Sequence, residues 1–324
     1  MLAEGLRDAL NQAGHRAELV SLPFQWLPHA RLFQSALAWR LLDLSAANGV
    51  KIDRIITTKF PSYAARHPNK IVWLVHQYRQ AYDWHGTSLS EFTASPQDRA
   101  TREKLFALDR RVLGEARARF AISKNVAARL KRFNALDATP LYPPPRLTGK
   151  FRAGEYGAYA LYVGRLDRAK RIDLLLRALA QTKRGRVVIA GAGAEEQKLK
   201  QLASRLSIAS RVEFLGFVDD TRVIELYANA RAVYYAPVDE DYGFAAVEAL
   251  MSARPVITTD DAGGVLEFIE NAEDGWVTRA EASEIALALT RAFEDAETCR
   301  ALGERGRERA RAISWDAVVT TLTA

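Results

Sequence analysis

Two glutamates in the second half of the chain, Glu240 and Glu248, carry the first chemical signal in the sequence. Seven residues separate them in the stretch EDYGFAAVE, where Gly243 marks a turn before a predicted helix. With Glu240 in the loop and Glu248 about one turn inside the helix, both carboxylates can reach one ligand from different depths. The first amides of that helix, from Gly243 and Phe244, then point at a phosphate or a hydroxyl. Two solvated surface carboxylates are the alternative interpretation.

A second group of candidate residues follows an apolar run in the stretch GRLDRAKRID. Gly164 allows the backbone to turn close to a ligand, and Arg165 and Lys170 supply cations at the start of the next helix. Free amides at a helix N-terminus add to these charges, which together suit a diphosphate. An ordinary helix start with surface cations is the other interpretation, and the residues alone leave both open.

Two further glycine turns raise cofactor chemistries that the residues disfavour. In IAGAGAEEQ, Gly191 and Gly193 match part of a dinucleotide fingerprint, but Glu196 stands where the third small residue is required. We therefore expect a tight turn without a cofactor there. In TTDDAGGVLEF, Asp260 and Asp261 lack a nearby histidine, so we expect surface aspartates and no metal site.

Strands and helices alternate along the second half, as apolar runs and turn residues indicate. The expected strands are AYALYVGRL, GRVVIAGAG, RVEFLGFV, RAVYYAPV and RPVITTD, with a helix after each of the first four. Such alternation predicts a doubly wound α/β domain, whose ligands bind outside the carboxyl ends of the strands. The glutamates and the cations above follow two of these strand ends.

The first half predicts a second α/β domain that is joined to the other by a proline-rich linker. An amphipathic helix stops at Gly14, a strand is expected from Ala17 to Leu22, and IDRIITTKF and NKIVWLVHQY have the pattern of buried parallel strands. Three consecutive prolines in LYPPPRL, residues 141–147, cannot continue a helix or a central strand. We therefore place the boundary there, with a first domain at 1–145.

Composition sets limits on location and partners. The 324 residues carry a formal net charge of +7, and the pI near 9.5 favours anionic partners in general. A single cysteine, Cys299, excludes an internal disulfide framework and suits a cytoplasmic location. We expect no membrane-spanning helix and no export signal, because no apolar window is long enough and the first residues include acids.

The stretches GRLDRAKRIDLLLRAL, VVIAGAG, VEFLGFVDD and EDYGFAAVEALMSARPVITTDDAGGVLEFI resemble family 4 of the retaining glycosyltransferases, which use nucleotide sugars. The resemblance implies the GT-B fold, in which two Rossmann-like domains face a central cleft. It implies that Arg165 and Lys170 bind the diphosphate, that Glu248 binds the ribose hydroxyls and that Glu240 contacts the transferred sugar. The same resemblance implies that the remaining donor-binding residues are Gly164, Val218, Gly243 and Phe244.

In the first half, the resemblance is weaker but still indicates particular residues. His76 follows a predicted strand, where the family often has a histidine near the anomeric carbon; a structural histidine is the alternative. The closing ISWDAVVTTL is similar to the family's last helix, which implies that 312–324 joins the first domain, that 146–311 binds the donor and that Trp315 packs on the first domain. The chain begins inside the helix that ends at Gly14 and His15, so the family's first strand and glycine-rich loop are not found. We expect either that Met1 is not the natural start or that the protein is an altered homologue.

The resulting functional hypothesis is a metal-independent hexosyltransferase that moves a sugar from a UDP- or GDP-linked donor to a saccharide or lipid-linked acceptor. It implies a role in polysaccharide, lipopolysaccharide or glycolipid assembly, with peripheral contact between the protein and an acidic inner membrane surface. The alternative is a catalytically impaired homologue that acts as a nucleotide-sugar-binding or scaffold protein. A nicotinamide-dependent oxidoreductase and a nucleic-acid-binding protein are disfavoured, the latter because no cluster interleaves cations with aromatic residues.

Overall fold

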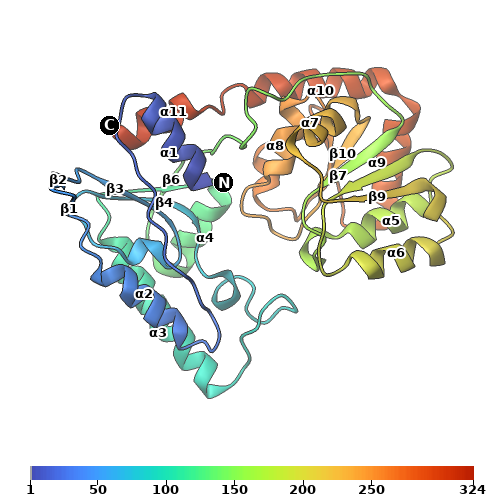
Figure 1. Ribbon diagram of the computed structural model, residues 1–324. Helices are drawn as coiled ribbons and strands as arrows, with labels where there is room; N and C mark the ends of the chain where they lie inside the picture. The colour runs from blue at the N-terminus through green and yellow to red at the C-terminus, as the bar shows by residue number, and fades with distance from the viewer. Residues whose placement is uncertain (1) are drawn as a thin grey trace. The chain divides into compact units, whose positions relative to one another are not determined.

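The computed structural model describes residues 2–324, and the chain divides into two compact units (Figure 1). One unit runs to Pro143 and includes Trp315–Ala324, while the other comprises Pro144–Ser314. The boundary between the units along the chain therefore falls inside the three-proline run, where fixed φ angles and missing N–H donors end regular structure. Whether Met1 is the natural start is a question that lies outside the described residues.

The first unit is built on a four-stranded parallel sheet in the order β3-β4-β5-β6, and β1 and β2 form a separate antiparallel pair. The strands are β1 Ala46–Ala47, β2 Val50–Lys51, β3 Ile55–Lys59, β4 Lys70–His76, β5 Ala118–Ala121 and β6 Thr139–Pro140. The helices are α1 Leu2–Gln12, α2 Arg31–Leu41, α3 Pro96–Gly114, α4 Lys124–Asn134 and α11 Trp315–Thr323, with 3-10 helices η1 Ser62–Ala64 and η2 Arg79–Ala81. β4 is buried continuously from Lys70 to Leu74, as expected of a strand that is covered on both faces.

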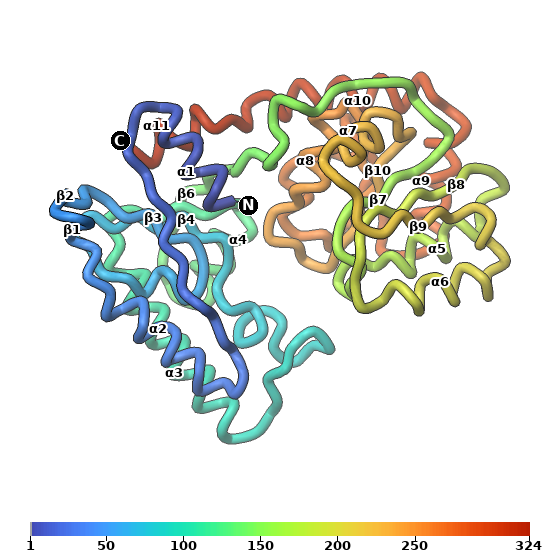
Figure 2. Tube along the Cα trace, viewed as in Figure 1, coloured from blue at the N-terminus to red at the C-terminus, as the bar shows by residue number. Residues whose placement is uncertain are grey.

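The two ends of the described chain pack together within the first unit, where α1 lies beside α11 (Figure 2). Trp315 begins α11, and its ring centroid lies 6.3 Å from that of Trp73 in an edge-on arrangement. Gly5 of α1 leaves room for this ring, because an added Cβ would come within 2.6 Å of it. The Trp315 ring therefore contacts both Trp73 of β4 and Gly5 of α1, so it holds α1 and α11 together beside the sheet.

The strand predicted from Ala17 to Leu22 is wrong, because this segment has no regular secondary structure. The amide of Ala17 donates to Asn11 Oδ1 at 2.9 Å, and Asn11 Nδ2 donates to the Ala17 carbonyl at 3.0 Å. Leu19 and Val20 are exposed. The apolar alternation is typical of a strand, but a strand also requires a neighbour to satisfy its backbone groups, and none pairs with this segment.

The second unit contains a six-stranded sheet in the order β12-β11-β10-β7-β8-β9, and every neighbouring pair is parallel. The strands are β7 Tyr159–Val163, β8 Arg186–Ala190, β9 Val212–Gly216, β10 Ala232–Tyr234, β11 Val256–Thr259 and β12 Gly275–Thr278. The α-helices are α5 Ile172–Ala180, α6 Glu196–Arg205, α7 Asp220–Asn229, α8 Phe244–Met251, α9 Ala282–Glu294 and α10 Ala296–Ala310. The 3-10 helices are η3 Arg168–Lys170, η4 Ala209–Arg211 and η5 Gly264–Glu267.

Helices cover both faces of this sheet, as the predicted doubly wound fold requires (Figure 1). α5 packs against α6 and α9, whereas α8 packs against α10. Right-handed crossovers place the helices that follow β7 and β8 on one face and those that follow β9 and β10 on the other. Within residues 2–324, every helix is too short or too polar to traverse a lipid bilayer.

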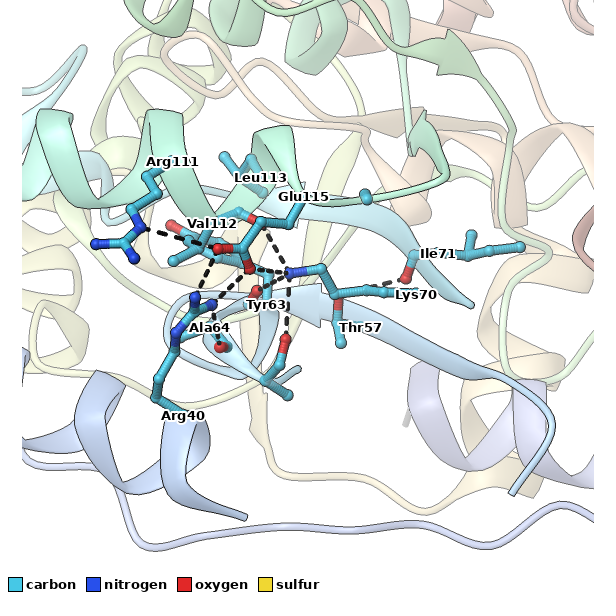
Figure 3. A network of polar contacts seen from close by, with 12 residues as sticks. Arg40, Thr57, Tyr63, Ala64, Lys70, Ile71, Arg111, Val112, Leu113 and Glu115 are labelled. Atoms are coloured by element: carbon cyan, nitrogen blue, oxygen red, sulfur yellow. Dashed lines mark hydrogen bonds and ion pairs between the residues drawn. The ribbon is translucent and has the colours of Figure 1, made fainter. Parts of the chain in front are cut away.

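A buried lysine organises the amino end of the first sheet (Figure 3). Lys70 begins β4, and its side chain is almost completely buried. Its ammonium donates to three backbone carbonyls, those of Tyr63 at 3.1 Å, Ala65 at 3.1 Å and Val112 at 2.7 Å. Burial lowers the pKa of Lys70, and the charge of Glu115, 3.4 Å away, acts in the opposite direction.

Glu115 is shared by several cations in this network. Arg40 of α2 donates to both of its carboxylate oxygens, at 2.5 and 2.6 Å, and also to the carbonyl of Ala64. Arg111 lies further away, at 3.9 Å. A pocket of about 450 Å³ opens beside these residues, but their polar groups already satisfy one another, so we assign no ligand to it. The network joins α2, α3 and β4.

Replacing Lys70 with methionine is expected to destabilise the protein by about 3 kcal/mol, because three carbonyls and a carboxylate lose their donor. The matched control is Arg111→Met, which removes a cation from the same carboxylate at an exposed position and should cost less than about 0.5 kcal/mol. Urea unfolding measures both values. Equal stability of the two variants would contradict a structural role for Lys70.

Candidate functional site

The strand order of the second sheet creates a switch point between β7 and β10. These strands are parallel neighbours, but the chain continues from β7 to β8 on one side and from β10 to β11 on the other. In open parallel sheets, ligands bind outside the carboxyl ends of the strands at such a point. The candidate residues that follow these two strands are Gly164, Arg165, Lys170, Glu240, Gly243, Phe244 and Glu248.

Glycines interlock the turn after β7 with the turn after β8. An added Cβ on Gly191 would come within 1.8 Å of the Gly164 carbonyl oxygen, and one on Gly193 within 2.4 Å of the Leu166 oxygen. The amide of Gly164 donates to the carbonyl of Ala190 at 3.0 Å. The paired glycines that resemble part of a dinucleotide fingerprint thus have a packing role, because they let the loop that carries Arg165 lie against the next strand.

The two candidate cations occupy different environments. The Arg165 side chain is 81% exposed and lies 3.4 Å from Asp167. Lys170 is only 11% exposed and forms an ion pair with Glu240, whose side chain is 22% exposed. Lys170 also donates a hydrogen bond of 3.1 Å to the hydroxyl of Tyr235, directly after β10. Lys170 and Glu240 are therefore brought together, while Arg165 is left in contact with solvent.

The backbone of Glu240 is held by the loop that follows β11. Its amide donates to the carbonyl of Ala262 at 3.1 Å, and its carbonyl accepts from the amide of Gly264 at 2.7 Å. An added Cβ on Gly264 would come within 2.5 Å of the Asp241 carbonyl oxygen. The two loops fit closely together, so the Glu240 side chain projects from a fixed backbone.

Helix α8 begins at Phe244, as predicted, directly after Gly243. Gly243 has a φ of 98°, which favours glycine, and an added Cβ would come within 2.8 Å of Val265 Cγ2. The amide of Phe244 belongs to the first helical turn, where N–H groups have no carbonyl partner inside the helix. The positive end of α8, at Phe244, therefore lies four residues after Glu240.

Glu248 lies one turn into α8, and Tyr227 of α7 donates a hydrogen bond of 2.9 Å to its carboxylate. Burial raises the pKa of Glu248 to about 7, although the Tyr227 hydrogen bond and the charge of Arg146 act in the opposite direction. The carboxyl group therefore changes charge near neutral pH. A carboxyl whose pKa is shifted this far marks a candidate binding or catalytic group.

Val218 follows β9, the edge strand of the sheet, and so lies apart from the switch point. Its neighbour Phe217 is 89% exposed, which is unusual for a large aromatic side chain. Phe217 was not among the residues predicted from the sequence motifs. Its position at the carboxyl edge of the sheet makes it a candidate surface for stacking a flat ring.

His76 ends β4 and lies in the first unit, whereas the other candidate residues lie in the second. Its Nδ1 is 2.6 Å from the Gln77 carbonyl oxygen, which can only accept, so Nδ1 carries the proton and Nε2 is the acceptor in the neutral ring. Gln77 donates to Asn134 at 3.1 Å, and Asn134 donates to Tyr82 at 3.3 Å. A buried amide network thus holds the turn that presents His76.

Two tyrosines of the site, Tyr227 and Tyr235, were missed because aromatic residues in such elements are typical of a core. The position of Tyr235 at a strand end was the one available signal. Asp261, considered above as a metal ligand, pairs with Arg171 at 2.8 Å. Among residues 2–324, no three His, Cys, Asp or Glu side chains are grouped to hold a metal ion.

The architecture is that of the GT-B class, an α/β fold with two parallel sheets, as predicted. The structure resembles sucrose-phosphate synthase from Thermosynechococcus elongatus, with a TM-score of 0.77 and 22% identity over 98% of this chain and 90% of that one. It also resembles Anabaena HepE in complex with UDP and glucose, with a TM-score of 0.70 and 18% identity over 98% and 87% of the two chains. These likenesses concern the fold.

A family model described as "Glycosyl transferases group 1" matches residues 148–309, which is half of the chain. The chain therefore belongs to the group 1 glycosyltransferases, and the resemblance drawn from its motifs is confirmed. It is 34% identical over 139 residues to an uncharacterized glycosyltransferase of Methanocaldococcus jannaschii, which covers 42% of this chain and 35% of that protein. It is 29% identical over 203 residues to the D-inositol 3-phosphate glycosyltransferase of Nocardia farcinica, or 55% and 45% of the two proteins. The chain thus spans less than half of the length of these relatives.

Replacing Gly191 with alanine is expected to destabilise the protein by about 3 kcal/mol, because the new methyl group would overlap the Gly164 carbonyl. Gly216→Ala is the matched control, since Gly216 also has a positive φ but an added Cβ there meets nothing within 4 Å. The control should lose about 1 kcal/mol from backbone strain alone. Thermal unfolding compares them, and a loss no larger than that of the control would contradict the interlocked loops.

Proposed function

We propose that this chain transfers a hexosyl group from a nucleotide diphosphate sugar to a hydroxyl acceptor, with retention of the anomeric configuration. The observation that supports this most is the meeting of Lys170 and Glu240 at the switch point of a parallel sheet, close in sequence to the start of α8. One cluster then offers positive charge for a diphosphate and a carboxylate for sugar hydroxyls. Membership of the group 1 glycosyltransferases supports the reaction class.

In this proposal, the cations act on the leaving group. Negative charge develops on the diphosphate as its bond to the sugar breaks. We assign its stabilisation to Lys170, Arg165 and the first amides of α8, from Gly243 and Phe244. Gly164 contributes by allowing close approach of the backbone. The exposed Arg165 pays little desolvation cost before it binds a phosphate, whereas Lys170 is already held in position.

The carboxylates act on the two sugar rings of the donor. Glu240 accepts hydrogen bonds from hydroxyls of the transferred sugar, and Glu248, deeper along α8, accepts them from the ribose hydroxyls. Val218 lines the part of the site that takes the base, where the exposed ring of Phe217 offers a stacking surface. His76, which belongs to the first unit, is the residue that we propose acts on the anomeric region, with Nε2 as its hydrogen-bond acceptor.

The chemical step breaks the bond between the anomeric carbon and the diphosphate oxygen and forms a bond from that carbon to the acceptor oxygen on the same face. The proton of the acceptor hydroxyl passes to the departing diphosphate, so no enzyme nucleophile is required. The protein orients the donor and the acceptor and stabilises the developing charge. Cations and helical amides, which predominate in this site, suit that role.

The acceptor that we propose is a saccharide or a lipid-linked saccharide used in polysaccharide, lipopolysaccharide or glycolipid assembly. The net charge of +7 favours contact with an acidic membrane surface from the cytoplasmic side. Donors linked to UDP and to GDP are the first to test, because the charged residues of the site recognise the diphosphate and the sugars and do not select the base.

The direct test is calorimetric titration with UDP- and GDP-sugars, followed by a transfer assay with the donor that binds. Lys170→Met should lower kcat/KM about 100-fold, because a cation that stabilises the leaving group is lost. Arg168→Met is the matched control, since it removes an exposed cation from the same 3-10 helix and should change kcat/KM less than about twofold. Equal effects would contradict the role of Lys170, and binding without any transfer would favour the scaffold alternative.

Donor affinity should also depend on the ionisation of Glu248. Its pKa of about 7 lies above the ordinary value of 4.5, so the carboxyl is largely protonated at pH 6 and must lose its proton to accept two ribose hydroxyls. The affinity for a nucleotide sugar, whose diphosphate diester does not titrate in this range, should therefore rise about tenfold from pH 6 to pH 8. Glu248→Gln should bind weakly without this dependence. A flat profile for the wild-type protein would contradict the assignment.

A further inference from the structure

The Lys170 ammonium and the Glu240 carboxylate form an ion pair with each other. Neither group can bind the donor of the proposed function until this ion pair opens. A diphosphate reaches the Lys170 ammonium only if the Glu240 carboxylate moves away from it. The carboxylate would then lie close to the negative phosphates, where like charges repel one another. Both side chains are largely shielded from water, so this repulsion is weakly screened.

We propose that Glu240 is the internal counter-anion of Lys170 in the empty site, and that this pair makes the site prefer a nucleotide sugar over the nucleoside diphosphate product. The inference rests on the proposed function and deepens it. A nucleotide sugar supplies hydroxyl groups that donate to the displaced carboxylate. A nucleoside diphosphate opens the same ion pair but offers the carboxylate no donor, and its terminal phosphate adds negative charge.

Tyr235 is the positioning residue of this exchange. Its hydroxyl accepts from Lys170 at 3.1 Å and also hydrogen-bonds to Glu240, so it connects the two members of the pair. Tyr235 is buried, and its pKa is raised well above the ordinary value. Burial is the largest cause, and the charge of Glu240 is the second. The hydroxyl therefore stays protonated and can donate to Glu240 while it accepts from Lys170.

The backbone around the pair favours a movement of side chains alone. Glu240 is tied through its amide to Ala262 and through its carbonyl to Gly264. Lys170 ends η3, and its amide donates to the carbonyl of Asp167 at 3.1 Å. Because both backbones are anchored, exchange of the ion pair for ligand contacts requires rotation of the Glu240 side chain, without movement of the loop.

The decisive measurement is the affinity for UDP and GDP and for the corresponding nucleotide sugars, in the wild-type protein and in Glu240→Gln. Removal of the counter-anion should strengthen binding of the diphosphate roughly fivefold or more, because the ammonium no longer has to leave a carboxylate. Binding of the nucleotide sugar should weaken or stay unchanged, because the carboxylate that accepts its hydroxyls is lost. The affinity for the nucleoside diphosphate product, relative to the affinity for the nucleotide sugar, should therefore rise.

Glu240→Ala tests the same point without an amide that forms new hydrogen bonds, and thermal unfolding verifies that both variants fold. Glu213→Gln is the control for total charge, because Glu213 lies on β9 and pairs with Arg186 at 3.9 Å. The control should leave both affinities unchanged. In turnover, the diphosphate product should inhibit Glu240→Gln more strongly than it inhibits the wild-type protein.

The outcomes separate this inference from the proposed function. If the wild-type protein binds nucleotide sugars but neither Glu240 variant binds the diphosphate more tightly, the counter-anion role is overturned and the proposed function stands. A gain of the same size in Glu213→Gln would also overturn it, since the effect would reflect total charge. If no variant binds any nucleotide, the proposed function fails and this inference fails with it.

Discussion

The parallel pairing of β7 with β10 is the contact on which the candidate site depends. Lys170 and Glu240 are 70 residues apart in the sequence, and they meet because each follows one of these two strands. The register aligns Ala232 with Ala160 and Val233 with Leu161. β10 is only three residues long, and a slip of one residue would turn its side chains to the opposite faces of the sheet. Short as it is, this pairing decides whether the cation and the carboxylate face each other.

Cations in the protein differ in their partners: some buried ones donate to main-chain carbonyls, whereas Lys170 contacts side chains that can rotate. Arg254 is completely buried and donates to backbone carbonyls, those of Ser252, Ala230, Gly154 and Ala228. Lys70 in the first unit is bonded to carbonyls in the same way. A main-chain carbonyl cannot move away from such a cation unless the surrounding backbone unfolds. Lys170 instead contacts two side chains, Glu240 and Tyr235, and a side chain can rotate when a ligand replaces it.

Much of the second unit could be predicted from the sequence because its signals are local. Apolar runs bounded by glycine define the strands, and Gly243 correctly marks the start of α8. The turn before β11 is also local: Ala253 has a φ of 54°, a left-handed conformation that glycine adopts more easily. Each of these features is encoded by a few neighbouring residues.

The features that the sequence did not reveal depend on partners that are distant along the chain. The segment from Ala17 to Leu22 has the alternation of a strand, yet alternation does not report whether a second strand lies beside it. The hydroxyl of Tyr235 is a candidate site group because it hydrogen-bonds to both Lys170 and Glu240, which are distant from one another in the sequence. Likewise, the raised pKa of Glu248 follows from burial, which a single stretch of sequence does not specify.

Donor binding and sugar transfer place different demands on the two units. The groups proposed to hold the donor all belong to Pro144–Ser314, so nucleotide affinity depends on one sheet and its own loops. Transfer additionally requires an acceptor and, in our proposal, His76, which is held by a separate amide network in the first unit. If all donor-binding groups lie in one unit, the protein can bind its donor without being able to transfer the sugar. In our proposal, the interlocked glycine turns serve donor affinity, whereas the turn after β4 serves sugar transfer.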